Sequence, residues 1–197
     1  MLQVFFNLPI EKYYNMCYIR LGEICMEEKR IIEELAQNIN PVFSEIKDGV
    51  LVKVDPSDVK DYQYTTPQEV TKIGFRAFEN CVLAAVTIGD NVTEIGRCAF
   101  QGQEWLQKVK MGSNVAKIGP YAFNGCTSLM DVELNDKLKE IGEWAFYDCS
   151  YLVHIPLPEN LEKIGKGAFS CTPIEKTIYG QFEENKKARE EKVVAKK

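Results

Sequence analysis

Apolar residues recur along the middle of the chain with a spacing of 22 or 23 residues. An isoleucine followed by glycine marks each copy: the isoleucines are Ile73, Ile95, Ile118, Ile141 and Ile164. Between these marks lie short segments in which apolar and polar residues alternate, as in "KVKM" and "DVEL", and this alternation indicates short strands. Because equal spacing lets equivalent residues stack, the pattern predicts a solenoid of parallel strands about 4.8 Å apart.

The two halves of each copy carry different residues. In the first half, Ile-Gly is followed by two variable residues and then by Ala-Phe; the phenylalanines are Phe78, Phe100, Phe123, Phe146 and Phe169. We interpret Ile, Ala and Phe as core residues, the glycine as a turn residue with a positive φ, and the variable pair as solvent-facing. Ala-Phe is expected to start a short helical or 3₁₀ turn. The second half reads Leu-x-x-Val-x-Leu, clearest at Leu129, Val132 and Leu134, and in the fifth copy it degrades to Ile174, Thr177 and Tyr179.

A single copy cannot fold alone. Its roughly seven core side chains would contribute on the order of 10–20 kcal/mol when buried, whereas ordering its residues costs on the order of 35 kcal/mol. Stacked copies share a continuous core, so the chain is expected to fold as one array.

Cysteine follows the phenylalanine in four copies. Cys81, Cys126 and Cys149 lie three residues after it and Cys171 two residues after it, while Gln103 replaces cysteine in the second copy. On stacked coils these residues form a line along the axis and not a tetrahedron, so we predict no metal site. Buried small side chains with weak S–H donors are the favoured interpretation.

These motifs resemble the BspA-type (Treponema pallidum-type) leucine-rich repeat. The shared pattern is Cys-x-x-Leu-x-x-Val-x-Leu followed by Leu-x-x-Ile-Gly-x-x-Ala-Phe, and it covers residues 70–180; residues 46–70 resemble the segment that often precedes such arrays. The resemblance implies a curved solenoid that binds proteins and, in the family, often serves adhesion. Pro156 falls in a strand position and lacks an N–H, so local irregularity is expected there.

The expected fold is an α/β repeat solenoid, a right-handed coil of short parallel strands and helical turns with an N-terminal helical cap. Its parts are residues 1–40 (helical cap or leader), 41–69 (a lead-in segment with a degenerate first coil), 70–180 (five repeats) and 181–197 (a charged tail). The cap is expected over residues 26–38, because Ile31, Ile32 and Leu35 share one helical face. A start at Met26 is an alternative, in which residues 1–25 would be an over-extended reading frame. The tail offers little apolar surface, so the last coil would be open or covered by a second copy in a homo-oligomer.

Composition narrows the classes of function. The formal net charge of −5 argues against sequence-independent nucleic-acid binding, and no apolar run is long enough to span a membrane. No secretory signal is recognised at the N-terminus, and seven cysteines form an odd number. Both features predict a cytoplasmic location; the alternative is the cell surface, if the chain is a fragment.

Two columns of charged residues are expected to face solvent. The residue before each isoleucine alternates in sign, which predicts a stabilising ladder: Lys72, Glu94, Lys117, Glu140 and Lys163. The other strands present a mixed-charge surface that either neutralises itself or binds a protein. Its candidate partner-binding residues are Lys108, Lys110, Asp131, Glu133, His154 and Lys176. Trp105, Trp144 and Tyr151 complete the candidate set, because aromatic residues are enriched at interface hot spots.

No catalytic arrangement is found in the sequence. His154 is the only histidine, and Cys149 five residues earlier should point inward while His154 points outward. We therefore predict neither an enzyme nor a cofactor. Three hypotheses follow: a non-catalytic protein-interaction module, a cell-surface or secreted adhesin fragment, and an enzyme or regulator that uses His154.

Overall fold

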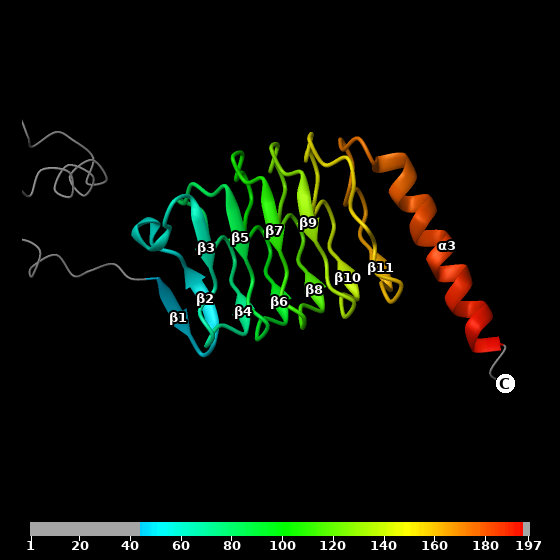
Figure 1. Ribbon diagram of the computed structural model, residues 1–197, viewed down its shortest axis with the longest axis horizontal. Helices are drawn as coiled ribbons and strands as arrows, with labels where there is room; N and C mark the ends of the chain where they lie inside the picture. Colours follow the sequence, from blue (N-terminus) through cyan, green and yellow to red (C-terminus); the bar gives the residue numbers. More distant parts are fainter. Residues whose placement is uncertain (1–43, 195–197) are drawn as a thin grey trace, which may run out of the picture. The chain divides into compact units, whose positions relative to one another are not determined.

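The computed structural model describes residues 44–194, which form a series of stacked coils followed by a helix (Figure 1). The strands belong to two sheets. The seven-stranded sheet has the order β1 (Glu45–Lys47), β2 (Val50–Lys53), β4 (Lys72–Ile73), β6 (Glu94–Ile95), β8 (Lys117–Ile118), β10 (Glu140–Ile141) and β11 (Lys163–Ile164). The four-stranded sheet has the order β3 (Gln63–Thr65), β5 (Ala85–Thr87), β7 (Lys108–Lys110) and β9 (Asp131–Glu133). The described helices are the 3₁₀ helix η1 (Pro56–Asp58) and α3 (Glu175–Val194).

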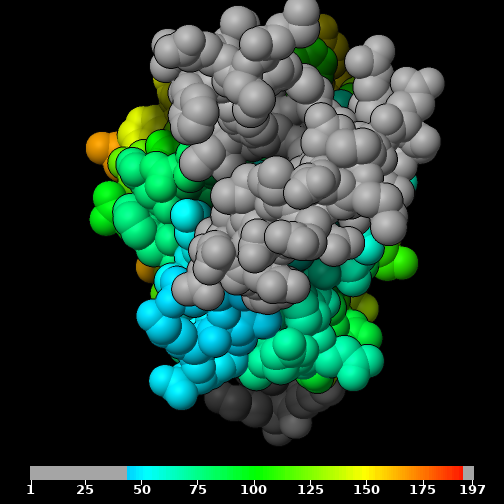
Figure 2. Space-filling model, turned by 90° about the vertical axis from the view of Figure 1, so that its left-hand side faces the viewer, coloured from blue at the N-terminus to red at the C-terminus, as the bar shows by residue number. Residues whose placement is uncertain are grey.

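Residues one period apart lie side by side, as the sequence predicts. Ile118 pairs with Ile95 on one side and with Ile141 on the other, and the strands run parallel. Val109 has the same relation to Val86 and Val132 in the four-stranded sheet. A view along the coils shows the residues of the first strands, in blue and cyan, in front of later coils in green (Figure 2). The predicted solenoid of short parallel strands is therefore confirmed.

The N-terminal cap cannot be compared with the structure, and the Ala-Phe segments can. The helical cap over residues 26–38 and the alternative start at Met26 lie outside the described residues. Ala-Phe lies in a run of turns with i→i+3 hydrogen bonds, such as that from the Cys81 N–H to the Phe78 oxygen (3.1 Å), so the expected turn is present but does not extend into a helix. Within residues 44–194 no helix is apolar enough over a sufficient length to cross a membrane.

The buried phenylalanines form a stacked column through the core. The ring centroids of Phe100 and Phe123 are 5.0 Å apart with an interplanar angle of 2°, and those of Phe123 and Phe146 are 5.1 Å apart at 9°. Tyr64 meets the first ring of the column edge-on, and Tyr179 meets the last ring in the same way. Such aromatic pairs contribute about 0.5–1.5 kcal/mol each beyond the burial of their area. One continuous core therefore connects all five copies.

The glycine after each isoleucine is required by the close approach of coils. We expected a turn with a positive φ, and that interpretation is wrong: the positive-φ glycines of the described chain are Gly49, Gly102, Gly125 and Gly167. A Cβ atom added at Gly96 would lie 2.4 Å from the Ile73 carbonyl oxygen, and one added at Gly142 would lie 2.5 Å from the Pro120 nitrogen. A side chain at this position would push neighbouring coils apart.

The left-handed residue is instead the one before alanine. Its φ is 51° at Arg76, 56° at Cys98, 58° at Tyr121, 55° at Trp144 and 65° at Gly167. This conformation costs a non-glycine residue roughly 1–2 kcal/mol. The variable pair also faces solvent only in part, since Cys98 is buried and Tyr121 and Trp144 are half-buried. The pair is thus free in residue type but constrained in backbone.

The cysteine column satisfies backbone carbonyls of the preceding coil. The Cys126 thiol donates to the Phe100 oxygen (3.2 Å) and the Cys149 thiol to the Phe123 oxygen (3.3 Å). In the second copy the Gln103 side-chain amide donates to the Phe78 oxygen at 2.8 Å. In the fifth copy the buried residue three positions after phenylalanine is Thr172, whose hydroxyl donates to the Phe169 oxygen of its own coil (2.6 Å), whereas Cys171 is exposed. Assigning Cys171 to this column was therefore wrong.

Helix α3 covers the last coil. Ile174 and Ile178 join the core, and Tyr179 and Phe182 pack against it. Glu175 is the first residue of α3, where negative charge is favourable. Its carboxylate accepts a hydrogen bond from the hydroxyl of Ser170, which precedes the helix (2.8 Å). The segment assigned to a fifth strand is thus the first part of a helix. The expectation of an open C-terminal edge, and of a homo-oligomer formed through it, loses its basis.

Candidate functional site

The exposed face of the four-stranded sheet carries the predicted charges, and they pair with each other. The Lys108 ammonium lies 2.7 Å from the Asp131 carboxylate and 3.4 Å from that of Glu133. Hydrogen bonds to Asp131 and then to Glu133 raise the pKa of Lys108. Each of these three side chains thus has an opposite charge beside it, although one ammonium against two carboxylates leaves the set with one net negative charge. Lys110 lies on the same strand with its side chain exposed.

The other two charged candidates lie outside this sheet. His154 is exposed, but residues 152–158 form no strand, as expected from Pro156. Lys176 lies on α3 and not in a strand, because the fifth copy ends in a helix. The structure therefore brings together Lys108, Lys110, Asp131 and Glu133 and leaves Lys176 on a different element.

The three aromatic candidates have different environments. The side chains of Trp105 and Tyr151 are 68% and 64% exposed. Trp144 is half-buried: its ring meets that of Tyr147 edge-on at 5.3 Å, and a Cβ atom at Gly167 would lie 2.7 Å from its indole carbons. Trp144 thus covers the next coil, whereas Trp105 and Tyr151 are available to a partner.

Sequence reasoning missed five exposed apolar residues: Val52 on β2 and four residues beside the four-stranded sheet. Tyr62, Val82, Met130 and Val153 have exposed side chains. Tyr62 and Met130 directly precede the first residues of β3 and β9, and Val82 lies three residues before β5. Val153 directly precedes His154, which is equivalent to these first strand residues. The leucine that begins each Leu-x-x-Val-x-Leu segment is buried. An apolar residue directly before or after that leucine is expected to point the other way, and this signal could have identified Val82, Met130 and Val153.

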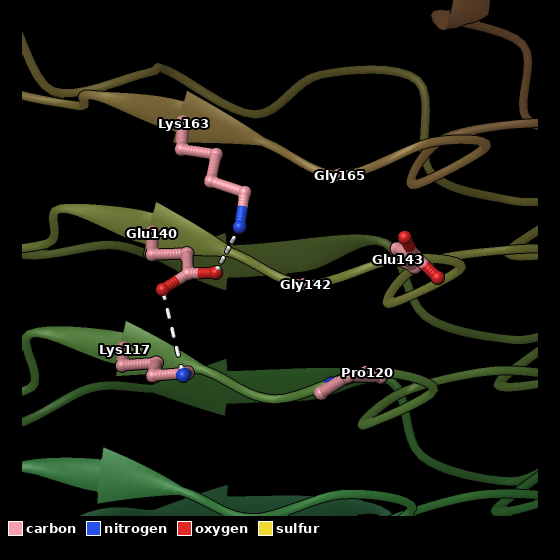
Figure 3. Close-up of a pocket in the computed structure, with 7 residues that line it drawn as sticks. All are labelled: Lys117, Pro120, Glu140, Gly142, Glu143, Lys163 and Gly165. Atoms are coloured by element: carbon pink, nitrogen blue, oxygen red, sulfur yellow. Dashed lines mark hydrogen bonds and ion pairs between the residues drawn. The ribbon is translucent and has the colours of Figure 1, made fainter.

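The ladder of the seven-stranded sheet borders a shallow pocket. The Glu140 carboxylate lies 2.8 Å from the Lys163 ammonium and 3.5 Å from that of Lys117 (Figure 3). A hydrogen bond from Lys163 is the main cause that lowers the pKa of Glu140. The pocket has a volume of about 160 Å³, and Gly142 and Gly165 lie at its floor beside these side chains. Lys117, Glu140 and Lys163 are paired with one another, and Glu143 lines the pocket without an ion pair in the described chain; we assign the paired ladder a structural role.

The described thiols and His154 do not form a reactive pair. Burial raises the pKa of Cys149 to about 12 and that of Cys81 to about 11. Cys149 is fully buried and its thiol donates to a backbone oxygen, while His154 is exposed. In the described part of the chain no cluster of three potential metal ligands is present.

Repeat length, stacked parallel strands and a shared core define a leucine-rich-repeat-like solenoid. The family described as "BspA type Leucine rich repeat region" matches residues 63–187 in six copies, and the match begins where β3 begins. The chain belongs to this family. Its members are typically surface proteins that act in protein interaction, and the homologues are non-enzymatic modules.

Solved structures extend the comparison. The leucine-rich repeat protein of T. pallidum is 27% identical, with a TM-score of 0.59 over 63% of this chain and 60% of that one. A leucine-rich cell surface protein from Faecalibacterium prausnitzii is 28% identical, with a TM-score of 0.46 over 62% of this chain and 42% of that one. The chain thus spans less than two thirds of either protein. No curated protein matches it in sequence.

Proposed function

We propose that this chain is a non-catalytic module that binds a partner protein through the four-stranded sheet and the exposed aromatic residues beside it. The observation that supports this proposal is the exposure of Trp105 and Tyr151 on a scaffold whose coils are fixed by hydrogen bonds and a shared core. Large aromatic side chains held on rigid elements are frequent hot spots of protein interfaces. Membership of an interaction family points the same way.

Affinity capture with two kinds of surface variant tests the proposal. The immobilised chain is incubated with lysate of the source organism, and each captured protein is quantified against Trp105→Ala/Tyr151→Ala and against Lys108→Gln/Asp131→Asn/Glu133→Gln. A matched control is Phe75→Ala, since Phe75 is 60% exposed but lies on the other side of the coil, after Ile73-Gly74. A protein retained by the wild type and by the control but lost from either surface variant supports the proposal. Equal capture by all four proteins contradicts it.

The alternative function is adhesion at the cell surface. It is favoured by a family whose members are typically surface proteins. Antibody labelling of intact and permeabilised cells separates the two: labelling of intact cells supports adhesion, and labelling only after permeabilisation supports the cytoplasmic location that we propose. The hypothesis of an enzyme using His154 gains no support, because no thiol or ion-pair partner of His154 occurs in the described chain.

A further inference from the structure

Most of the exposed apolar side chains of the described chain gather in one place. Eight large hydrophobic side chains are exposed between residues 44 and 192. Six of them form what we call the apolar stripe: Tyr62, Val82, Trp105, Met130, Tyr151 and Val153. Their exposed fractions run from 49% to 68%, so they are not the rim of the core. Contiguous exposed apolar surface of this kind marks a binding site more often than scattered single residues do.

The register of the four-stranded sheet places these residues in two adjacent rows. Gln63, Ala85, Lys108 and Asp131 are paired neighbours, so the residues one position earlier are neighbours too. Backbone hydrogen bonds confirm this row: Ala84 N–H donates to the Tyr62 oxygen (2.7 Å), and Met130 N–H to the Gln107 oxygen (3.1 Å). The row two positions earlier contains Val82, Trp105, Ser128 and Tyr151. Its register is fixed by Ser128 N–H, which donates to the Glu104 oxygen (3.2 Å).

The stripe carries no charge over four coils. Between Val82 and Val153 the remaining members of the two rows are Ala84, Gln107 and Ser128. Of the charges beside the stripe, those of Lys108, Asp131 and Glu133 are paired with one another, whereas exposed Glu104 and Lys110 flank it without an ion pair in the described chain. The two rows themselves therefore offer no counter-charge to a charged ligand that lies along them, and such a ligand would lose hydration there. An uncharged apolar ligand meets a complementary surface.

We propose that the apolar stripe binds an uncharged, apolar segment of a partner protein that lies along the stacking axis; this rests on the proposed function. The stripe is linear, because each coil adds one position to each row about 4.8 Å from the last. Trp105 and Tyr151 lie two coils apart and act as anchors, with Met130 as an adaptable contact between them. The aliphatic side chains of Val82, Met130 and Val153 favour protein over carbohydrate, because a sugar stacks on aromatic rings and leaves aliphatic groups uncovered.

A phage-displayed library of random linear peptides is the probe. The library is selected on the full chain, and enriched peptides are synthesised and titrated by fluorescence polarisation. The expected peptides are apolar and uncharged, and Trp105→Ala and Tyr151→Ala each weaken their binding by at least about 30-fold. Lys108→Gln/Asp131→Asn/Glu133→Gln leaves binding within about threefold, since rim charges contribute little. Thermal denaturation checks the fold of each variant, and Met130→Gln gives a second, volume-conserving disruption of the stripe.

Four outcomes overturn the proposal. Charged peptides that depend on Lys108 and not on Trp105 move the site to the sheet face and leave the proposed function intact. Failure to enrich any peptide removes the stripe as a protein site, while the lysate capture still judges the proposed function. Binding of neutral oligosaccharides on a glycan array, lost in Trp105→Ala, identifies a carbohydrate site. A dimer in sedimentation velocity that dissociates in Trp105→Ala identifies a second copy as the occupant.

Discussion

Single residues of this protein are constrained mainly by the neighbouring coil. The glycine after isoleucine has an ordinary φ, yet an added Cβ atom would overlap backbone atoms one coil away. The cysteine column likewise donates hydrogen bonds to carbonyls of the preceding coil. Residue type is thus fixed by distances between coils, which the sequence of one repeat does not state. This explains why the glycines were recognised as essential but were given the wrong role.

Gly142→Ala is expected to destabilise the chain strongly. The new Cβ atom would lie 2.5 Å from the Pro120 nitrogen and 2.6 Å from the Gly119 carbonyl carbon, both of them backbone atoms. Overpacking typically costs about 1–3 kcal/mol, and contact with backbone atoms, which cannot rotate away, puts this change near the upper end. Urea denaturation measures the loss, and Gly180→Ala serves as the control, because no atom lies within 4 Å of its Cβ position on α3. A loss below about 1 kcal/mol at Gly142 would contradict the close-approach explanation.

Gln103 tests whether the column works through hydrogen bonding. Gln103→Ala leaves the buried Phe78 oxygen without this donor and is expected to cost about 1–3 kcal/mol. Gln103→Cys restores the residue found at the equivalent positions, whose thiols reach the same carbonyl one coil away, and should recover most of that loss. Chemical denaturation of both variants provides the comparison. Equal losses for Ala and Cys would show that packing volume, not donation, matters at this position.

At the scale of elements, apolar spacing predicts most strands but not the end of the array. The Leu-x-x-Val-x-Leu segments gave β5, β7 and β9 because their alternation has no helical alternative. In the fifth copy, Ile174, Ile178 and Phe182 also have helical spacing, and the structure uses that spacing to cover the core. A sequence pattern with two periods does not say which one tertiary packing will select.

Ile178 is expected to hold α3 on the last coil. Its side chain is 3% exposed and belongs to the core, so Ile178→Ala should cost about 2–4 kcal/mol. Gln181→Ala, on the exposed side of the same helix, is the matched control and should change stability little. Sedimentation velocity of the same variants examines self-association. If Ile178→Ala unfolds at the same urea concentration as wild type, α3 does not act as the cover of the core.

At the scale of the whole array, the sequence predicted the core better than the surface. Trp105 and Tyr151 were placed in solvent correctly, whereas Trp144 packs over Gly167. Met130 and Val153 were missed, since alternation with Val132 and Ile155 assigns both side chains inward, whereas both are exposed. Which side chains the neighbouring coils cover is a property of the stack and not of a single repeat.

The buried thiols should report unfolding of the entire array. Cys126 and Cys149 are fully buried, and burial raises the pKa of Cys149 to about 12, so the reactive thiolate is scarce at pH 9. Iodoacetamide labelling followed by peptide mass spectrometry should modify exposed Cys171 first. Cys126 and Cys149 should be modified together, at the rate of global unfolding. Labelling of Cys149 in the native chain well before Cys126 would indicate that its coil opens separately.

The phenylalanine column has a consequence for how such a protein changes length over generations. Three of its four inner junctions are nearly interchangeable, with ring separations of 5.0, 5.1 and 5.2 Å, whereas the first, between Phe78 and Phe100, is closer at 4.3 Å; a tyrosine set at a steep angle terminates each end. A tandem duplication of one period inside the array would therefore recreate the same junction and leave both terminators in place. The length of the array along its stacking axis can therefore change by whole repeats while the residues at both ends stay the same.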